Sequence, residues 1–411
     1  MANVSSSNGL EKRPKLRFPS FDEPWEENEL SHYLVENTER NRGLAFGKGD
    51  VLSVSGEYGV INQIAFQGRS FAGESVADYH IVGTDDIVYT KSPLKANPYG
   101  IIKVNKGIPG IVSTLYAVYH PLNTVAPRFV DLYFANDLRL NKFLKPLVNI
   151  GAKHDMKVNN SFVLTGTVVF PSISEQQKLV DFFAKLDRRI EAQRKIVDAL
   201  KKYKRGVMQR IFRNMSMLSP SGFETVQLSA IFKKISRRNS NEEIKNVITN
   251  SAEYGLIPQR DFFDKDIAVD GNTSNYYVIE HGDFVYNPRK SNTAPYGPFN
   301  RYEREERGII SPLYTCLVLQ ADIEPSYLAW YFKSDAWYRY IYDNGSQGVR
   351  HDRVSMTDGL LRGIPVIIPS KEAQLKIAKL LDCLESRFQT ELSQYESLKS
   401  IRVALLQQLF I

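Results

Sequence analysis

The sequence predicts a mixed α/β (α+β) fold in which a globular domain followed by a long helix occurs twice. The first observation is a stretch of helical periodicity from Ser174 to Phe212. The second is a later version of this stretch, from Glu372 to Phe410, with similar residues at corresponding positions. The third is that short runs of β-branched and aromatic residues, with shared motifs, precede both stretches. Together these observations indicate a duplicated chain.

Each long helix is predicted to carry an apolar seam. Apolar residues recur at steps of three and four, a period of about 3.5 that is typical of a seam covered by one partner helix. At 1.5 Å per residue such a helix extends roughly 58 Å, whereas the radius of gyration of a domain of about 150 residues is about 15 Å. We therefore expect the helices to project and to pair with each other; a homodimer through one of them is the alternative. The predicted pairing residues are Leu179, Phe183, Leu186, Ile190, Leu200, Ile377, Leu381, Leu384, Phe388 and Leu398.

The duplication is also visible in the parts that precede the helices. Motifs recur in one order and at a nearly constant offset, which chance rarely produces. The matched stretches are 55–61 with 251–257, 86–89 with 283–286, 98–100 with 295–297, and 110–116 with 308–314.

The strand-like runs include residues 87–89, 101–104 and 115–119, separated by Gly, Pro, Asn and Asp. A helical stretch, 129–134 in one half and 327–332 in the other, precedes a last strand that stops at Pro171 or Pro369. The predicted divisions are a disordered tail (1–17), a first domain (18–170), a central helix (171–213), a second domain (214–368) and a C-terminal helix (369–411).

The composition is that of a globular protein. The 411 residues are 43% hydrophobic and 24% charged, with a net charge of +7 that favours a polyanionic partner. Two distant cysteines indicate neither a disulfide framework nor a zinc site, and a reducing cytoplasm is the expected location. The sequence has no apolar run long enough to span a bilayer and no signal-peptide core, so no membrane association is expected.

The sequence offers no convincing catalytic constellation. Asn97-Pro98-Tyr99 resembles the catalytic loop of adenine methyltransferases, but its counterpart is Ala294-Pro295-Tyr296 and no Gly-rich cofactor loop precedes it, so we interpret it as a structural turn. The six histidines lack metal-ligand spacing, and no metal site is predicted.

Repeated polar loops are the candidates for DNA contact. A Gly-x-Lys/Arg-His loop before the last strand of each half combines close backbone approach with a cation and a hydrogen-bonding ring, although a solvated turn is the alternative. Cations after the strands that end near Tyr89 and Tyr286 form a second group, which could contact guanine edges or phosphates. The candidate DNA-binding residues are Lys91, Lys95, Tyr99, Lys153, His154, Arg289, Lys290, Tyr296, Arg301, Gln347, Arg350 and His351.

The chain resembles a specificity subunit of a Type I restriction-modification system over about residues 14 to 411. The resemblance is carried by the doubled P-S-x-x-x-Q helix start (171–176 and 369–374), the Gly-x-Lys/Arg-His loops and the opening Leu16-Arg17-Phe18-Pro19. It implies two target recognition domains that read a bipartite, asymmetric site in double-stranded DNA, and an antiparallel coiled coil that spaces them.

The resemblance also implies partners. The coiled coil would dock modification (methyltransferase) subunits, two in number, and the complex would include restriction (translocase and nuclease) subunits in a bacterial cytoplasm. Catalysis would lie in these partners, with S-adenosylmethionine, ATP and Mg bound there and no cofactor bound by this chain. Two other classes stay open from the residues alone: a self-contained DNA methyltransferase or nuclease, and a structural tether that binds proteins.

Overall fold

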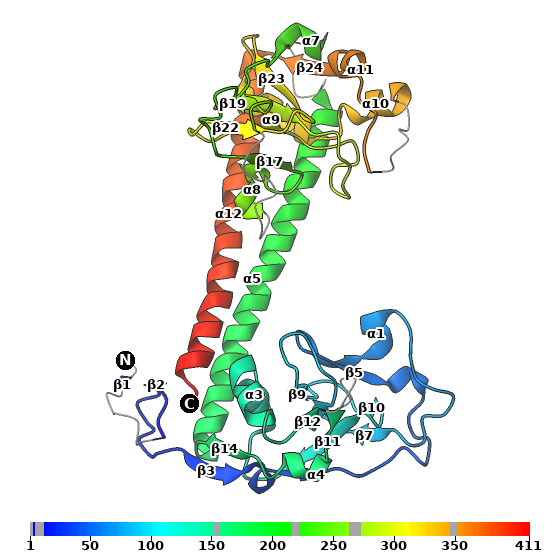
Figure 1. Cartoon of the computed structure of the whole chain (residues 1–411), viewed down its shortest axis with the longest axis vertical. Helices are drawn as coiled ribbons and strands as arrows, with labels where there is room; N and C mark the ends of the chain where they lie inside the picture. The colour runs from blue at the N-terminus through cyan, green and yellow to red at the C-terminus, as the bar shows by residue number, and fades with distance from the viewer. Residues whose placement is uncertain (1–2, 5–11, 151–155, 216–221, 263–272, 346–351) are drawn as a thin grey trace. The chain divides into compact units, whose positions relative to one another are not determined.

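The computed structural model contains two compact units, and each long helix contributes residues to both (Figure 1). Unit 1 comprises Met1–Gln193 and Gln394–Ile411, and unit 2 comprises Arg194–Ser393. The long helices are α5 (Ile173–Arg213) and α12 (Lys371–Gln408), green and red to orange in Figure 1. The structure describes residues 3–4, 12–150, 156–215, 222–262, 273–345 and 352–411.

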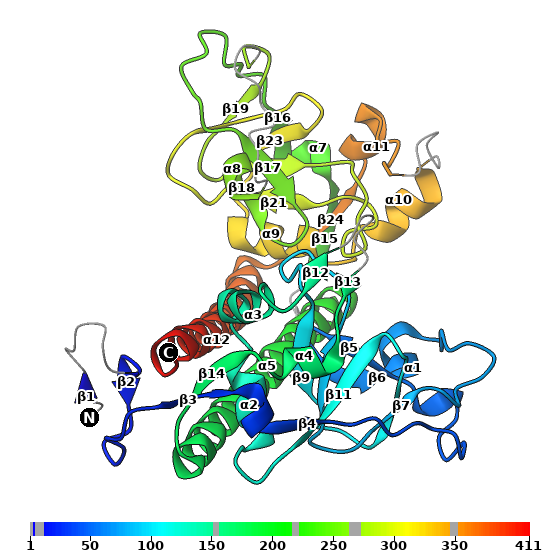
Figure 2. The same ribbon diagram turned by 60° about the horizontal axis from the view of Figure 1, so that its bottom comes forward.

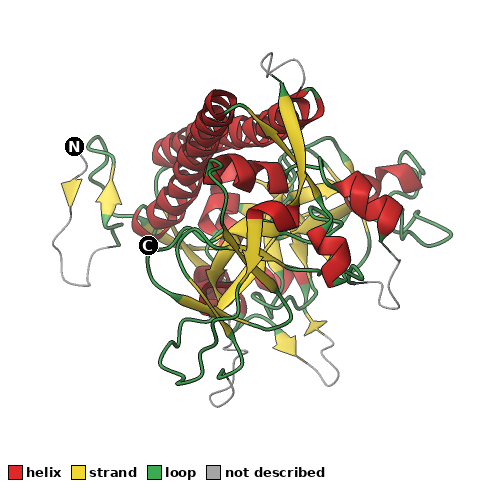
Figure 3. Cartoon of the chain, turned by 90° about the horizontal axis from the view of Figure 1, so that it is seen from above, coloured by secondary structure: helices red, strands yellow, loops and turns green. Residues whose placement is uncertain are grey.

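The predicted mixed fold is confirmed. The long helices contain 41 and 38 residues, and their ends fall within three residues of the predicted ends. Figure 3 shows that short strands and short helices joined by loops make up the rest of the described chain. The predicted division treated each long helix as a segment of its own, whereas each is divided between the two units.

Unit 1 is built around a four-stranded antiparallel sheet. Its short elements, in chain order, are β1 (Asn3–Val4), β2 (Leu16–Arg17), β3 (Glu26–Glu29), η1 (Leu30–His32), β4 (Leu34–Glu36), η2 (Lys48–Asp50), β5 (Leu52–Ser55), β6 (Gly59–Asn62), α1 (Gln63–Gln67), β7 (His80–Val82), β8 (Ile87–Thr90), β9 (Ile101–Val104), β10 (Gly110–Val112), β11 (Tyr116–Pro121), α2 (Pro127–Tyr133), α3 (Asp137–Leu144), β12 (Asn149–Ile150), β13 (Met156–Lys157), α4 (Asn160–Val163) and β14 (Thr167–Phe170). The sheet order is β4-β11-β8-β9, with the pairs β10-β7, β5-β6 and β14-β3 beside it.

Unit 2 repeats this arrangement. Its short elements are β15 (Phe223–Gln227), α7 (Leu228–Ile231), β16 (Phe232–Lys234), β17 (Ile248–Ser251), β18 (Gly255–Pro258), α8 (Gln259–Phe262), β19 (Tyr277–Ile279), β20 (Phe284–Tyr286), β21 (Phe299–Arg301), β22 (Gly308–Ile310), β23 (Thr315–Leu319), α9 (Pro325–Lys333), α10 (Tyr338–Asn344), α11 (Asp358–Arg362) and β24 (Pro365–Pro369). The order β16-β23-β20-β21 and the pairs β19-β22, β17-β18 and β15-β24 correspond one to one with those of unit 1. The predicted strands, the helical stretches (α2 and α9) and the duplication are confirmed.

The central strands separate two apolar cores because successive side chains point to opposite faces of a sheet. In β8, Ile87 and Tyr89 belong to the larger core, and Val88 belongs to a smaller core under β5, β7 and β10. In β20, Phe284 and Tyr286 face the larger core, and Val285 faces the smaller one. Both faces of these strands are covered, and every residue of β8 and β20 is therefore buried.

A buried glutamine fixes the start of each long helix. The Gln176 Oε1 atom accepts the backbone N–H of Ala126, which precedes α2, at 2.9 Å, and its Nε2 atom donates to the Pro171 carbonyl at 2.9 Å. Gln374 makes the same two hydrogen bonds, to the Glu324 N–H before α9 and to the Pro369 carbonyl, both at 2.9 Å. Figure 2 shows α2 and β14 next to the start of α5 in unit 1.

Aromatic residues at the ends of the long helices complete the larger core of each unit. In unit 1 the Phe410 ring stacks on Phe129, with centroids 5.6 Å apart, and meets Trp25 edge-on at 6.2 Å. In unit 2 the Phe212 ring lies 5.8 Å from Tyr327 and 5.6 Å from Tyr331. The end of one helix and the start of the other therefore share a single core in each unit.

Within each unit the two helix segments also contact each other. The Arg402 Nε atom of α12 donates to Asp187 Oδ1 of α5 at 2.5 Å in unit 1, and Lys204 pairs with Glu385 in unit 2. Among the predicted pairing residues, those beside the globular parts are buried and those farther along the helices are half-buried, because only a partner helix covers them. The buried ones are Leu179, Phe183, Ile377 and Leu381, and the half-buried ones are Leu186, Ile190, Leu200, Leu384, Phe388 and Leu398.

The expected disordered tail needs a correction at its inner end. Leu16–Arg17 forms β2, and the Arg17 side chain is buried in a bidentate ion pair with Glu175, at 2.9 and 2.7 Å. The corresponding positions of unit 2 hold Met215 and Ala373, which are both buried as well. The same site is thus ionic in one copy and apolar in the other.

This difference predicts the outcome of a double-mutant cycle. Arg17→Met or Glu175→Ala alone leaves one buried charge unpaired and should destabilise unit 1 by about 3 to 5 kcal/mol. The double variant, which copies the residues of unit 2, should recover most of this loss. Hydrogen exchange of amides within residues 160–193 would measure the effect, with peptides from 360–390 as the control. Equal destabilisation by the double variant and by the singles would contradict it.

Candidate nucleic-acid interface

Three loops of unit 1 meet at one end of its strands. Thr90, the last residue of β8, pairs with Ile101 at the start of β9 and with Tyr116 at the start of β11. Tyr116 and Val54 pack against the same small core, which brings the β5-β6 hairpin to the same end. We name this end the rim of unit 1, formed by residues 55–59, 91–100 and 113–116.

Lys91 has a defined position on this rim. Its Nζ atom donates to Asn160 Oδ1 at 3.1 Å and to the Thr114 carbonyl at 3.4 Å, and the Asn160 amide donates to Glu36 Oε1 at 2.9 Å. Burial lowers the pKa of Lys91, and the nearby Glu36 carboxylate opposes this shift. Lys95, in contrast, is exposed. Two of the predicted residues therefore lie on one rim, one fixed and one in solvent.

A repeated arginine joins the rim and was missed from the sequence. The Arg40 Nη1 atom donates to the Asp78 carbonyl at 2.8 Å, and Arg238 makes the corresponding bond to the Asn275 carbonyl in unit 2. The Arg238 guanidinium also stacks over the Tyr277 ring at 4.0 Å. The Arg-Asn pair at 40–41 recurs at 238–239 and was the signal available in the sequence.

His80 lies close to these cations and adds no charge. Its side chain is 2% exposed. Burial, together with the positive charges of Arg40 and Lys91, lowers the pKa of His80 to about 4. The ring is therefore neutral at pH 7, and the positive potential of the rim comes from the lysines and the arginine.

Unit 2 carries a matching rim, formed by residues 251–255, 287–298 and 311–314. Here the segment after β20 pairs with the segment before α11: the Lys290 N–H donates to the Asp352 carbonyl and the Val354 N–H to the Pro288 carbonyl, both at 2.9 Å. The Arg289 side chain is 69% exposed, with its Nε atom 4.0 Å from Asp352 Oδ2. Asp352 therefore lies beside Arg289 and Lys290, which are far from it in the sequence.

The residues of the Gly-x-Lys/Arg-His loops themselves are outside the part of the chain that the structure describes. Their role stays a prediction. These residues are Lys153, His154, Gln347, Arg350 and His351.

Tyr99 and Tyr296 belong to a structural turn, as interpreted from the sequence. Their carbonyl groups accept the hydroxyl groups of Tyr89 and Tyr286, at 2.7 and 2.8 Å. The glycine that follows each tyrosine has a positive φ, and a Cβ at Gly297 would lie 2.0 Å from a backbone oxygen. Both tyrosine side chains are half-buried, so their backbone shapes the rim.

Arg301 does not join the rim of unit 2. It pairs with Phe284 at the opposite end of the sheet, because β21 runs antiparallel to β20. Its side chain is 13% exposed and bonds to Glu303 Oε2 at 2.9 Å. In the sequence Arg301 was grouped with Arg289 because both follow the strand that ends near Tyr286, and the sequence does not give the direction of the strand that carries Arg301.

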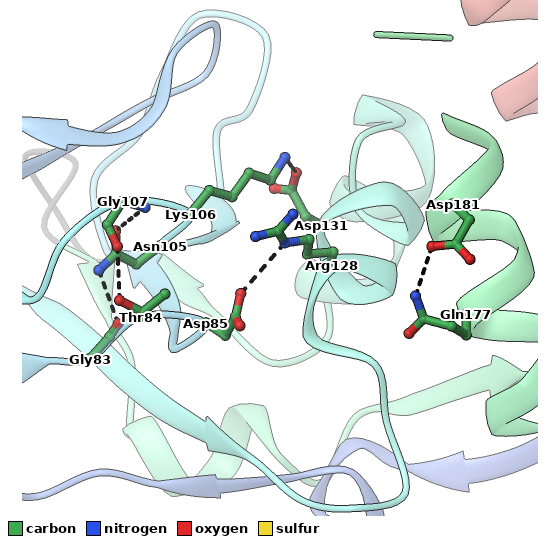
Figure 4. A network of polar contacts seen from close by, with 10 residues as sticks. All are labelled: Gly83, Thr84, Asp85, Asn105, Lys106, Gly107, Arg128, Asp131, Gln177 and Asp181. Atoms are coloured by element: carbon green, nitrogen blue, oxygen red, sulfur yellow. Dashed lines mark hydrogen bonds and ion pairs between the residues drawn. The ribbon is translucent and has the colours of Figure 1, made fainter. Parts of the chain in front are cut away.

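The end of the unit 1 sheet opposite the rim is closed by its own polar contacts (Figure 4). The Asn105 Nδ2 atom donates to the Gly83 carbonyl at 2.9 Å, and its Oδ1 atom accepts the Gly107 N–H at 3.1 Å. Lys106 pairs with Asp131 at 2.6 Å. A cation at this end is therefore a suitable control for one at the rim.

The described residues include no group of three or more His, Cys, Asp or Glu side chains that could hold a metal ion. Among the same residues, none of the helices is both long and apolar enough to cross a membrane.

Comparison with known proteins identifies the fold. Neither protein-family models nor curated protein sequences match the chain. Among solved structures, the Type-I restriction-modification system S subunit from M. genitalium matches with a TM-score of 0.52 and 14% identity, over 97% of this chain and 99% of that chain. A chain from a structure on complex assembly and conformational transition of the type I R-M system matches with a TM-score of 0.51 and 15% identity, over 94% and 97%. The chain therefore has the fold of Type I restriction-modification specificity subunits, which confirms the resemblance at the level of the fold.

Proposed function

We propose that this chain is the DNA-specificity subunit of a Type I restriction-modification complex and reads a bipartite, asymmetric site in double-stranded DNA. The observation that supports this most strongly is the pair of corresponding rims. Each presents cations on the same strand ends of the same fold, but most of the cations differ between the two rims: Lys91 and Lys95 in unit 1, Arg289 and Lys290 in unit 2. A duplicated reader with diverged contact residues suits two unlike half-sites.

The partners in this proposal are two modification subunits and the restriction subunits. S-adenosylmethionine, ATP and Mg would be bound by those subunits, and this chain would contribute no catalytic residue. Exposed apolar side chains along the long helices suit docking of the modification subunits. These residues are Ile196, Tyr203, Leu375, Leu380, Ile401 and Val403.

Methylation mapping tests the proposal as a whole. In cells that carry the chain with its modification subunits, methylated adenines should fall within one asymmetric split sequence, and losing the chain should abolish them. The alternative, a self-contained methyltransferase or nuclease, would be supported if the purified chain bound S-adenosylmethionine alone. A structural tether would leave the methylation pattern unchanged when the chain is lost.

Removing a rim cation should weaken DNA binding by the assembled methyltransferase and reduce its salt dependence. For Lys91→Ala or Arg289→Ala, the slope of log K against log [salt] should fall by about 0.9 for each phosphate group that the variant no longer neutralises, because fewer counterions are released. Fluorescence anisotropy over a salt series measures this. Lys106→Ala and Arg304→Ala, at the opposite ends of the sheets, are the matched controls. If the slopes changed equally in the controls, the rim cations would have only a structural role.

Exchanging one unit should change one half-site. Replacing residues 20–168 by the first domain of another specificity subunit should alter one half of the methylated sequence and leave the other half intact, because each unit has its own cores and rim. Sequencing of methylated DNA provides the measurement. A change in both half-sites would show that the two units are not independent readers.

The length of the paired helices should set the number of unspecified base pairs between the half-sites. Inserting one heptad into α5 within residues 185–203, and one into the facing part of α12 within residues 386–404, preserves the seam and adds about 10 Å. At 3.4 Å per base pair, the spacer should grow by about three base pairs. An unchanged spacer in the methylation map would contradict this role of the helices.

A further inference from the structure

Each rim presents an exposed leucine at the same place. Leu115 is 66% exposed and Leu313 is 62% exposed. Their N–H groups donate to the hydroxyl groups of Ser113 and Ser311, at 3.4 and 3.3 Å. The backbone of the tyrosine after each leucine bonds to the carbonyl of the same serine, at 3.1 Å in both units. Each leucine is therefore held in a turn with the same hydrogen bonds, one turn in each unit.

The fold of the turn does not require leucine. The serine forms the turn, and the tyrosine after the leucine packs against the smaller core in both units. The residue before the leucine differs, Thr114 in one unit and Pro312 in the other. The folding of each unit therefore does not explain why both copies have an exposed leucine at this position.

The position of the leucines indicates what they contact. The Thr114 carbonyl, next to Leu115, accepts the Lys91 Nζ atom. Leu313 precedes β23, which pairs with β20, the strand that leads to Arg289 and Lys290. Cations at such a surface contact the phosphate groups, whereas an apolar side chain gains no energy from a phosphate group and is buried favourably against the bases.

We propose that Leu115 and Leu313 make the same apolar, sequence-independent contact with the bases of the DNA, one in each half-site. The inference rests on the proposed function and assigns different roles to different residues of the rims. Residues that differ between the rims distinguish the half-sites, and the shared leucines contribute affinity to both. Apolar side chains of this size wedge against base steps in other DNA-binding proteins.

The test uses the assembled methyltransferase and a duplex that carries its split site. Leu115→Ala and Leu313→Ala should each weaken binding about tenfold, since alanine buries less apolar surface against the bases. The salt slope should not change, because both variants keep every cation of the rim. The ratio of specific to non-specific affinity should also stay constant. Leu115→Met should retain binding, since it preserves apolar volume.

Ile108→Ala is the matched control. Ile108 is 74% exposed and lies in the turn before β10, at the end of that strand opposite Leu115. Unchanged affinity in both leucine variants, or an equal loss in Ile108→Ala, would overturn the inference. Weaker assembly with the modification subunits at unchanged DNA affinity would overturn it in favour of a protein contact. Failure of the unaltered complex to retain the duplex would instead refute the proposed function.

Discussion

A buried glutamine amide is the interaction on which the rest of each unit depends. Gln176 and Gln374 join three elements at one point: the last strand of the unit, the helix that covers the sheet and the long helix that follows. A buried amide without partners costs about 1 to 3 kcal/mol, so the site tolerates only the geometry that satisfies both of its ends. The sheet packs against α2 or α9, and the rim lies at one end of the sheet. The glutamine hydrogen bonds therefore also determine the position of the rim.

The two copies show which parts of the fold are interchangeable. The ion pair between Arg17 and Glu175 occupies the site where unit 2 has Met215 and Ala373. A buried ion pair offsets its own desolvation only approximately, so an apolar pair of similar volume can replace it without changing the fold. The glutamine bonds, the turn after β8 and β20, and the arginine that follows β4 and β16 are repeated in both units. The framework is thus common to the two copies, whereas the cations that follow β8 and β20 differ between the two rims.

Much of the fold could be predicted because it is encoded by local sequence patterns. The seams of α5 and α12 follow from a helical period, and strands such as β8 and β9 follow from apolar runs between turn residues. The candidate site was less predictable. Lys91, Arg289 and Arg301 were grouped by their positions after a strand. Only the strand pairing shows that Arg301 lies at the other end of the sheet from Arg289, because the distance along the chain does not give the direction of the strand that carries it. Arg40 and Leu115 both recur in the second half, Leu115 within the matched stretch 110–116, but they were missed because the sequence does not show that they lie at the rim.

The duplication, the mixed α+β character of each copy and the long helix after each copy can be predicted from the sequence, because the constant offset between motifs and the periodicity of apolar residues are properties of the sequence. The three-dimensional structure was needed to show that each long helix is shared between two compact units and that the end of one helix completes the same core as the start of the other. It was also needed to show that loops far apart in the chain meet at one rim. Strand pairing brings Thr90 to both Ile101 and Tyr116, and such non-local pairing depends on packing that no single segment encodes.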